Sequence, residues 1–176
     1  ILRRVPDSVL WLLSDNSWAQ ANLQREAAAS GLDPQRLVFA ERALPENYLA
    51  RYALADLFLD TFPFNAGTTA NDALWMGLPV LTLSGRSFAA RMAGALLTAA
   101  GLPELITYDL QAYEDKAVEL ATTPGACLRL REHLAADPSR NADDETPGVL
   151  VAEDLSPADV MELNLDRVLG ILTAEG

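Results

Sequence analysis

An apolar strand, a small-residue loop and a helix follow one another between residues 54 and 79, and the loop holds residue types that suit anion binding. The strand ends at Asp60, and the helix begins at Thr68 and Thr69. A helix start offers unpaired backbone N–H groups and a partial positive charge, which attract phosphate. Because Gly67 has no side chain, a phosphate can approach the backbone there. The two threonine hydroxyls add donors, so this order predicts an anion site.

One turn into the same helix, Asp72 is placed to accept hydrogen bonds from ribose hydroxyls. A purely structural interpretation stays open beside this one. In it, Thr68 or Thr69 is only the N-cap of the helix, and Asp72 only complements the helix dipole. Capped strand-to-helix turns occur throughout α/β proteins, so residue types alone do not choose between the two interpretations.

The elements that must position this loop alternate along the chain. Apolar runs predict buried strands at 9–13, 36–40, 57–59, 80–83 and 104–107. Helical spacing, glycine stops and a first-turn proline predict helices at 17–30, 46–52, 68–76, 87–100, 110–120 and 128–134, and residues 1–4 are expected to end another helix. This alternation predicts an α/β fold, a parallel sheet with helices on both faces.

Composition excludes several classes of function. The net charge of −12, from 13 basic and 25 acidic residues, argues against nucleic acid and anionic membranes as partners. One cysteine and one histidine exclude an internal disulfide and make a zinc site improbable. No apolar run approaches the roughly 18 residues of a membrane span, and a signal-peptide pattern is lacking. We therefore expect a soluble, cytoplasmic protein.

From about Ile1 to about Leu134 the chain closely resembles the C-terminal half of the catalytic region of O-GlcNAc transferases and their bacterial SPINDLY-like relatives. The elements LDT, GTT and D-x-LW-x-G-x-P stand in register within LADLFLDTFPFNAGTTANDALWMGLPVLTLSGRSFAARMAGALLTAAGLPELI. The resemblance implies the Rossmann-like lobe of a two-lobed GT-B glycosyltransferase. Such an enzyme binds UDP-GlcNAc in this lobe and transfers GlcNAc to Ser or Thr hydroxyls of proteins, with no cofactor beyond the donor.

The resemblance also implies the residues that contact UDP. It assigns uracil to Ala43, Tyr48 and Arg51, with the backbone of Ala43 and the guanidinium of Arg51 against the base. Tyr48 replaces the usual histidine of the family, and its ring could still stack on the base. The diphosphate is assigned to Gly67, Thr68 and Thr69, and the ribose to Asp72.

Other positions depart from the family pattern. Pro45 stands where some relatives have a ribose-contacting lysine, and Lys116, the only lysine, lies in an unrelated stretch. The lysine that neutralises phosphate charge in the family is therefore absent. No catalytic residue and no metal ligand is assigned to the chain. We expect it to be a fragment that binds nucleotide weakly and, without the other lobe and its protein-acceptor site, has no transferase activity.

The composition shifts near residue 137. Residues 137–176 hold ten acidic and two basic groups, a net charge of −8, which leaves −4 for the first 136. We expect a UDP-sugar-binding lobe at 1–136, a polar linker at 137–147 and a strand-helix-strand tail at 148–176. The tail, with VLVAEDLSP and LNLDRVLG, resembles part of enzyme I of the phosphoenolpyruvate-dependent sugar phosphotransferase system, short of its phosphohistidine loop.

Two other functions remain open at this point. The chain is alternatively an interaction module or pseudoenzyme that keeps the fold without the site, which the missing lysine favours. A second alternative is a fragment of a phosphoryl-transfer protein, which the tail suggests but for which the histidine loop is missing. The tail itself is a fusion, part of a chimera or a divergent native C-terminus.

Overall fold

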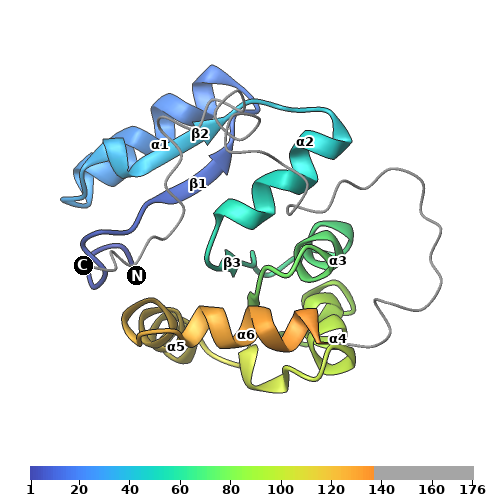
Figure 1. Ribbon diagram of the computed structural model, residues 1–176. Coiled ribbons are helices and arrows are strands. Elements are labelled where there is room, and N and C mark those ends of the chain that lie inside the picture. Colours follow the sequence, from blue (N-terminus) through green and yellow to red (C-terminus); the bar gives the residue numbers. More distant parts are fainter. Residues whose placement is uncertain (137–176) are drawn as a thin grey trace.

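Parallel strands with helices packed around them make up residues 1–136, the part of the chain that the computed structural model describes (Figure 1). β1 (Leu10–Leu13) and β2 (Leu37–Ala40) pair in a two-stranded parallel sheet. A second parallel sheet has the order β3-β4-β5, with bounds Phe58–Leu59, Val80–Leu83 and Ile106–Thr107. The predicted α/β class with parallel strands is confirmed, and its strands are divided between two sheets.

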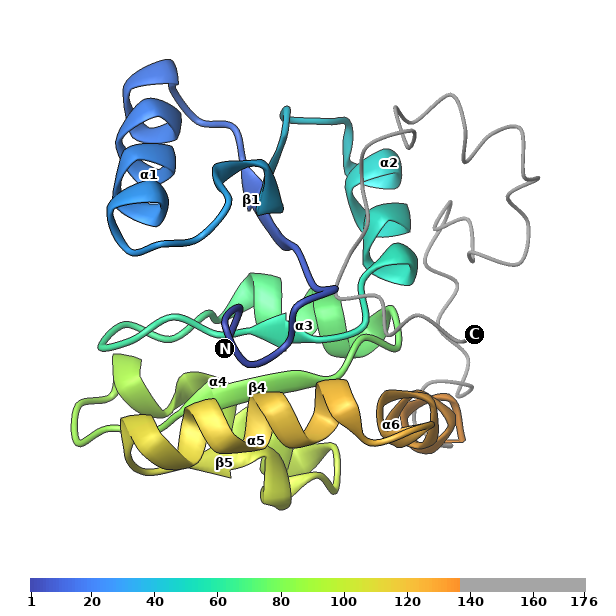
Figure 2. The same ribbon diagram turned by 90° about the vertical axis from the view of Figure 1, so that its left-hand side faces the viewer.

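Six α-helices surround these strands within the described residues. They are α1 (Ser17–Ala29), α2 (Pro45–Ala50), α3 (Thr68–Trp75), α4 (Met92–Ala99), α5 (Leu110–Thr122) and α6 (Ala126–Ala135). Short 3-10 turns precede or follow several elements, at Pro34–Arg36, Arg51–Leu54, Ala89–Arg91 and Pro103–Leu105. Figure 2 shows α5 lying along β4 and β5, with α6 beside it.

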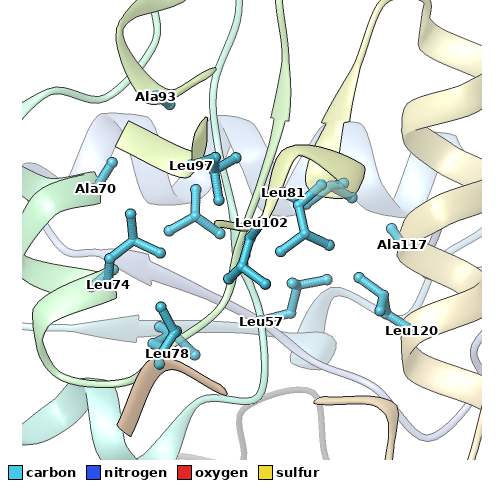
Figure 3. Packing of buried hydrophobic residues seen from close by; sticks show 14 of the residues in the cluster. Leu57, Ala70, Leu74, Leu78, Leu81, Ala93, Leu97, Leu102, Ala117 and Leu120 are labelled. Carbon is cyan, nitrogen blue, oxygen red and sulfur yellow. The ribbon is translucent and has the colours of Figure 1, made fainter. Parts of the chain in front are cut away.

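The hydrophobic core lies between the three-stranded sheet and the helices on its two sides. Figure 3 shows residues of α3 on one side of the strands and residues of α5 on the other. Alanines at the contacts let the helix backbones come close, and Ala70, Ala73, Ala93 and Ala117 are all fully buried. Leu81 and Leu97 fill the space between them without exposed surface. This packing fixes the position of α3 relative to the three-stranded sheet.

The first residues form a single turn where the end of a helix is predicted, and the N–H groups of Arg4 and Val5 donate to the oxygen of Ile1. Residues 2–4 form turns, and Pro6 follows after Val5. Three backbone carbonyl groups of this segment accept hydrogen bonds from the guanidinium of Arg36, those of Leu2, Val5 and Ser8, at 2.6–2.9 Å. The segment is therefore held by an arginine that lies directly before β2.

β1 and β3 are less buried than the sequence predicts. Every residue of β1 is at least partly accessible, and Leu13 is 50% exposed. Since β1 has β2 as its only partner strand among residues 1–136, its other edge has no neighbouring strand to cover it. Phe58 and Leu59 in β3 are likewise half-buried.

Two further expectations concern the rest of the chain and the membrane. The predicted linker 137–147 and tail 148–176 lie outside the described residues. Within residues 1–136, no helix combines the length and the apolar composition that crossing a membrane requires.

Candidate functional site

A pocket of about 410 Å³ lies where β3 ends and α3 begins. It is lined by Phe58, Asp60, Thr61, Phe64, Asn65, Ala66, Gly67, Thr68 and Thr69. The lining therefore includes all three residues that the sequence assigns to the diphosphate. The pocket opens at the carboxyl edge of a parallel strand, which is where open α/β sheets bind ligands.

The start of α3 leaves both threonine hydroxyls unused by the helix. Gly67 is the N-cap, and no side chain makes a capping hydrogen bond there. Thr68 and Thr69 are the first two helical residues, and both are exposed. The alternative interpretation, in which one of them caps the helix, is therefore wrong. Their hydroxyls and the free backbone N–H groups of the first turn remain available to an anion.

Asp72 is the fifth residue of α3 and is only partly exposed. A carboxylate complements the helix dipole most strongly within the first turn, and Asp72 lies beyond that turn. Burial raises the pKa of its carboxyl above the usual value of 3.8. No hydrogen bond from another described residue reaches its carboxylate, so both oxygens keep the accepting capacity that a ribose contact requires.

Asp60 anchors the loop that precedes α3. It is 2% exposed, and its carboxylate accepts hydrogen bonds from the Ala66 backbone N–H at 2.7 Å and the Thr82 hydroxyl at 2.6 Å. The Tyr113 hydroxyl donates to its backbone oxygen at 2.9 Å. Burial raises the pKa of Asp60, and the bonds from Ala66 and Thr82 counter part of that rise. One residue thus joins both ends of the loop to β4 and α5.

Asn65 is the second buried polar residue of this loop and is fully inaccessible. Its Nδ2 donates to the backbone oxygens of Thr61 at 2.9 Å and Leu83 at 3.3 Å. Its backbone N–H donates to the oxygen of Ala89 at 3.1 Å. Its Oδ1 is buried and accepts no hydrogen bond from any described residue. Asn65 therefore ties the pocket floor to the segment that follows β4.

The residues assigned to uracil lie on α2, on the loop before it and at the start of the 3-10 turn after it. Arg51 donates from Nη1 to the backbone oxygen of Glu41 at 2.6 Å, so it orders the loop that carries Ala43. The Tyr48 hydroxyl shares a hydrogen bond with the Tyr52 hydroxyl.

The hydroxyl of Tyr52 also donates to the backbone oxygen of Thr69 at 3.3 Å. The structure therefore brings Tyr48 and the start of α3 together, although residues 48 and 69 are far apart in the chain. Ala43, Tyr48, Arg51 and Asp72 are not among the residues that line the pocket itself.

Basic charge is scarce at this site. None of the residues that line the pocket is basic. Lys116 lies on α5, where its Nζ pairs with Glu119 at 2.7 Å. In the described part of the chain, no three His, Cys, Asp or Glu side chains gather as metal ligands.

Comparisons with known proteins identify the family that the chain resembles. Residues 1–141 match the glycosyl transferase family 41. A probable UDP-N-acetylglucosamine–peptide N-acetylglucosaminyltransferase of Arabidopsis thaliana, SEC, is 39% identical over 137 residues, which are 77% of this chain and 14% of that protein. The corresponding transferase of Caenorhabditis elegans is 41% identical over 131 residues, 74% of this chain and 11% of its own length.

Among solved structures, a mutant of the Thermobaculum terrenum O-GlcNAc transferase is similar with a TM-score of 0.77 and 31% identity. The match covers 93% of this chain and 31% of that one. The chain thus spans only a small part of these relatives. With a family match over most of its length and a fold shared with a solved member, the chain belongs to glycosyl transferase family 41.

Proposed function

We propose that this chain binds the UDP part of UDP-GlcNAc, as the nucleotide lobe of an O-GlcNAc transferase-like enzyme. The observation that carries the proposal is the pocket at the start of α3, which exposes two threonine hydroxyls that the helix does not use. The relatives are named as UDP-N-acetylglucosamine–peptide N-acetylglucosaminyltransferases, and these names support the choice of ligand.

The roles of the residues follow from their positions. The diphosphate lies against the Gly67 backbone and accepts hydrogen bonds from Thr68 and Thr69. Asp72 accepts from the ribose hydroxyls. The base lies beside α2, where Arg51 holds the loop through Glu41. The residues around the base are Ala43, Tyr48 and Arg51.

Binding by this lobe alone is weak. With no basic side chain lining the pocket, the anion is held by the helix dipole, backbone N–H groups and hydroxyls. The dipole contributes only about 0.3–1 kcal/mol to such an interaction. Transfer to a protein hydroxyl needs the acceptor site and the other lobe of the enzyme, since the chain spans 11–14% of its curated relatives. The chain by itself is therefore inactive as a transferase. We also propose that it is cytoplasmic.

The same lack of basic charge supports a second candidate. An interaction module that keeps the sheet and helices of the family would need no phosphate-neutralising lysine. Its pocket would be a remnant of the fold, and UDP would not bind.

Thermal unfolding with increasing UDP separates the two candidates. A ligand that binds only the folded state raises the melting temperature progressively as its concentration passes the dissociation constant. We expect such a rise with UDP and none with inorganic phosphate at the same ionic strength. A cooperative transition that UDP leaves unchanged at millimolar concentration would favour the interaction module. Transfer of GlcNAc from UDP-GlcNAc to a peptide by the chain alone would contradict the proposal that transfer needs the other lobe.

A further inference from the structure

Two tyrosine hydroxyls, one on α2 and one on the 3-10 turn after it, link this part of the chain to the start of α3. Tyr48 and Tyr52 lie one helical turn apart, and their rings meet edge to face with centroids 5.2 Å apart. Their hydroxyls share a hydrogen bond, and the Tyr52 hydroxyl donates to the backbone oxygen of Thr69 at 3.3 Å. This chain of contacts runs from the helix assigned to the base to a residue assigned to the diphosphate.

The direction of the hydrogen bonds follows from the number of protons. A phenol hydroxyl has one proton, and a backbone carbonyl oxygen can only accept. The proton of Tyr52 points to Thr69, so Tyr48 must be the donor to the Tyr52 oxygen. Loss of the Tyr52 hydroxyl therefore removes both bonds at once, and with them the hydrogen-bonded link between Tyr48 and Thr69.

The position of the Tyr52 ring does not depend on its hydroxyl. The ring packs against Phe58 of β3, with centroids 6.3 Å apart. The backbone oxygen of Tyr52 accepts from the Arg131 guanidinium of α6 at 3.4 Å. Burial raises the pKa of Tyr52, so its hydroxyl keeps its proton at neutral pH. Phenylalanine at this position would keep the packing and lose only the connection.

We propose that Tyr52 is a positioning residue that fixes the spacing between the base-binding and diphosphate-binding halves of the site. The proposal rests on the proposed function. A ligand that spans both halves gains affinity when they are already in register, because less ordering is needed on binding. A ligand that touches only α3 gains nothing from the connection. Tyr52 thus favours a whole nucleoside diphosphate over its separate parts.

The test compares Tyr52→Phe with the unaltered 176-residue chain. Tyr108→Phe is the matched control, since Tyr108 is 77% exposed and lies after β5. Binding of UDP is measured by calorimetry, and binding of pyrophosphate by line broadening of its phosphorus resonance at millimolar concentration. We expect Tyr52→Phe to weaken UDP about fivefold, which corresponds to about one hydrogen bond, and to change pyrophosphate by less than about twofold. The control should change neither.

Each other outcome overturns a definite statement. Equal UDP affinity in Tyr52→Phe and the unaltered chain would show that the connection does not position the site. Equal weakening of UDP and pyrophosphate would mean that Tyr52 only shapes the start of α3, and the coupling between the two halves would be refuted. Failure of UDP to bind the unaltered chain would instead refute the proposed function, and the role of Tyr52 with it.

Discussion

Replacing Asp60 with alanine removes the anchor of the pocket loop. Two donors lose their acceptor, the backbone N–H of Ala66 and the hydroxyl of Thr82, which is itself fully buried. A buried donor left without a partner costs about 1–3 kcal/mol, so the two cost about 2–6 kcal/mol together. Removing a carboxylate whose burial is unfavourable offsets part of that loss. We expect Asp60→Ala to lower the free energy of unfolding by about 2–4 kcal/mol.

Urea unfolding of the two proteins at neutral pH measures this difference. The exposed Asp7, replaced with alanine in the same way, is the control and should change the free energy by less than about 0.5 kcal/mol. The slopes of the two transitions should agree, so that the midpoints report stability. If Asp60→Ala costs no more than the control, Asp60 does not hold the loop, and the account of how the pocket is built is wrong.

Three further predictions concern the helix start, the core and pH. Thr68→Ala should change the free energy of unfolding by less than about 0.5 kcal/mol, against about 1 kcal/mol for a true N-cap, and a larger loss in urea unfolding would restore the capping role. Leu97→Ala should cost about 2–5 kcal/mol because Leu97 is fully buried, whereas the exposed Leu128→Ala should cost little; similar losses would contradict the assigned core. Because burial raises the pKa of Asp60 above 3.8, the folded state takes up that proton first as pH falls. The stability of the unaltered chain relative to Asp60→Asn should therefore increase as pH falls through that raised pKa toward 3.8, and a constant difference in urea titrations over this range would refute the shift.

Local signals in the sequence were sufficient for most of the elements. The strand at Val80–Leu83 has its predicted bounds, because a continuous apolar run there is bracketed by Pro79 and Ser84. The glycines that were expected to end helices, Gly31, Gly77 and Gly101, all have positive φ, a conformation that costs other residues energy. The first residues are held by Arg36 through the oxygens of Leu2 and Val5, a contact that no local pattern reveals.

The part of the site that a local motif forms was predictable from the sequence. The part that depends on contacts between residues far apart in the chain was not. The loop before α3 was found from Gly67 and the threonines after it, and three assigned residues line one pocket. The anchoring role of Asp60 depends on Thr82 and Tyr113, which are 22 and 53 residues away. A polar residue that ends an apolar run is the only sequence signal for such a role. The spacing of Tyr48 and Tyr52 by four residues likewise indicates contact between them but gives no indication of Thr69.

The central claim is that UDP binds at the start of α3, and calorimetric titration of UDP into four proteins tests it most directly. These are the unaltered chain, Thr69→Ala and Asp72→Ala, with Thr98→Ala as a control because the Thr98 hydroxyl only contacts its own helix, at the Gly94 oxygen. We predict measurable binding that Thr69→Ala and Asp72→Ala each weaken by about fivefold or more, while Thr98→Ala leaves it unchanged. Binding that is the same in all four proteins would place UDP elsewhere on the chain, and no binding to a chain that still unfolds cooperatively would contradict the account altogether.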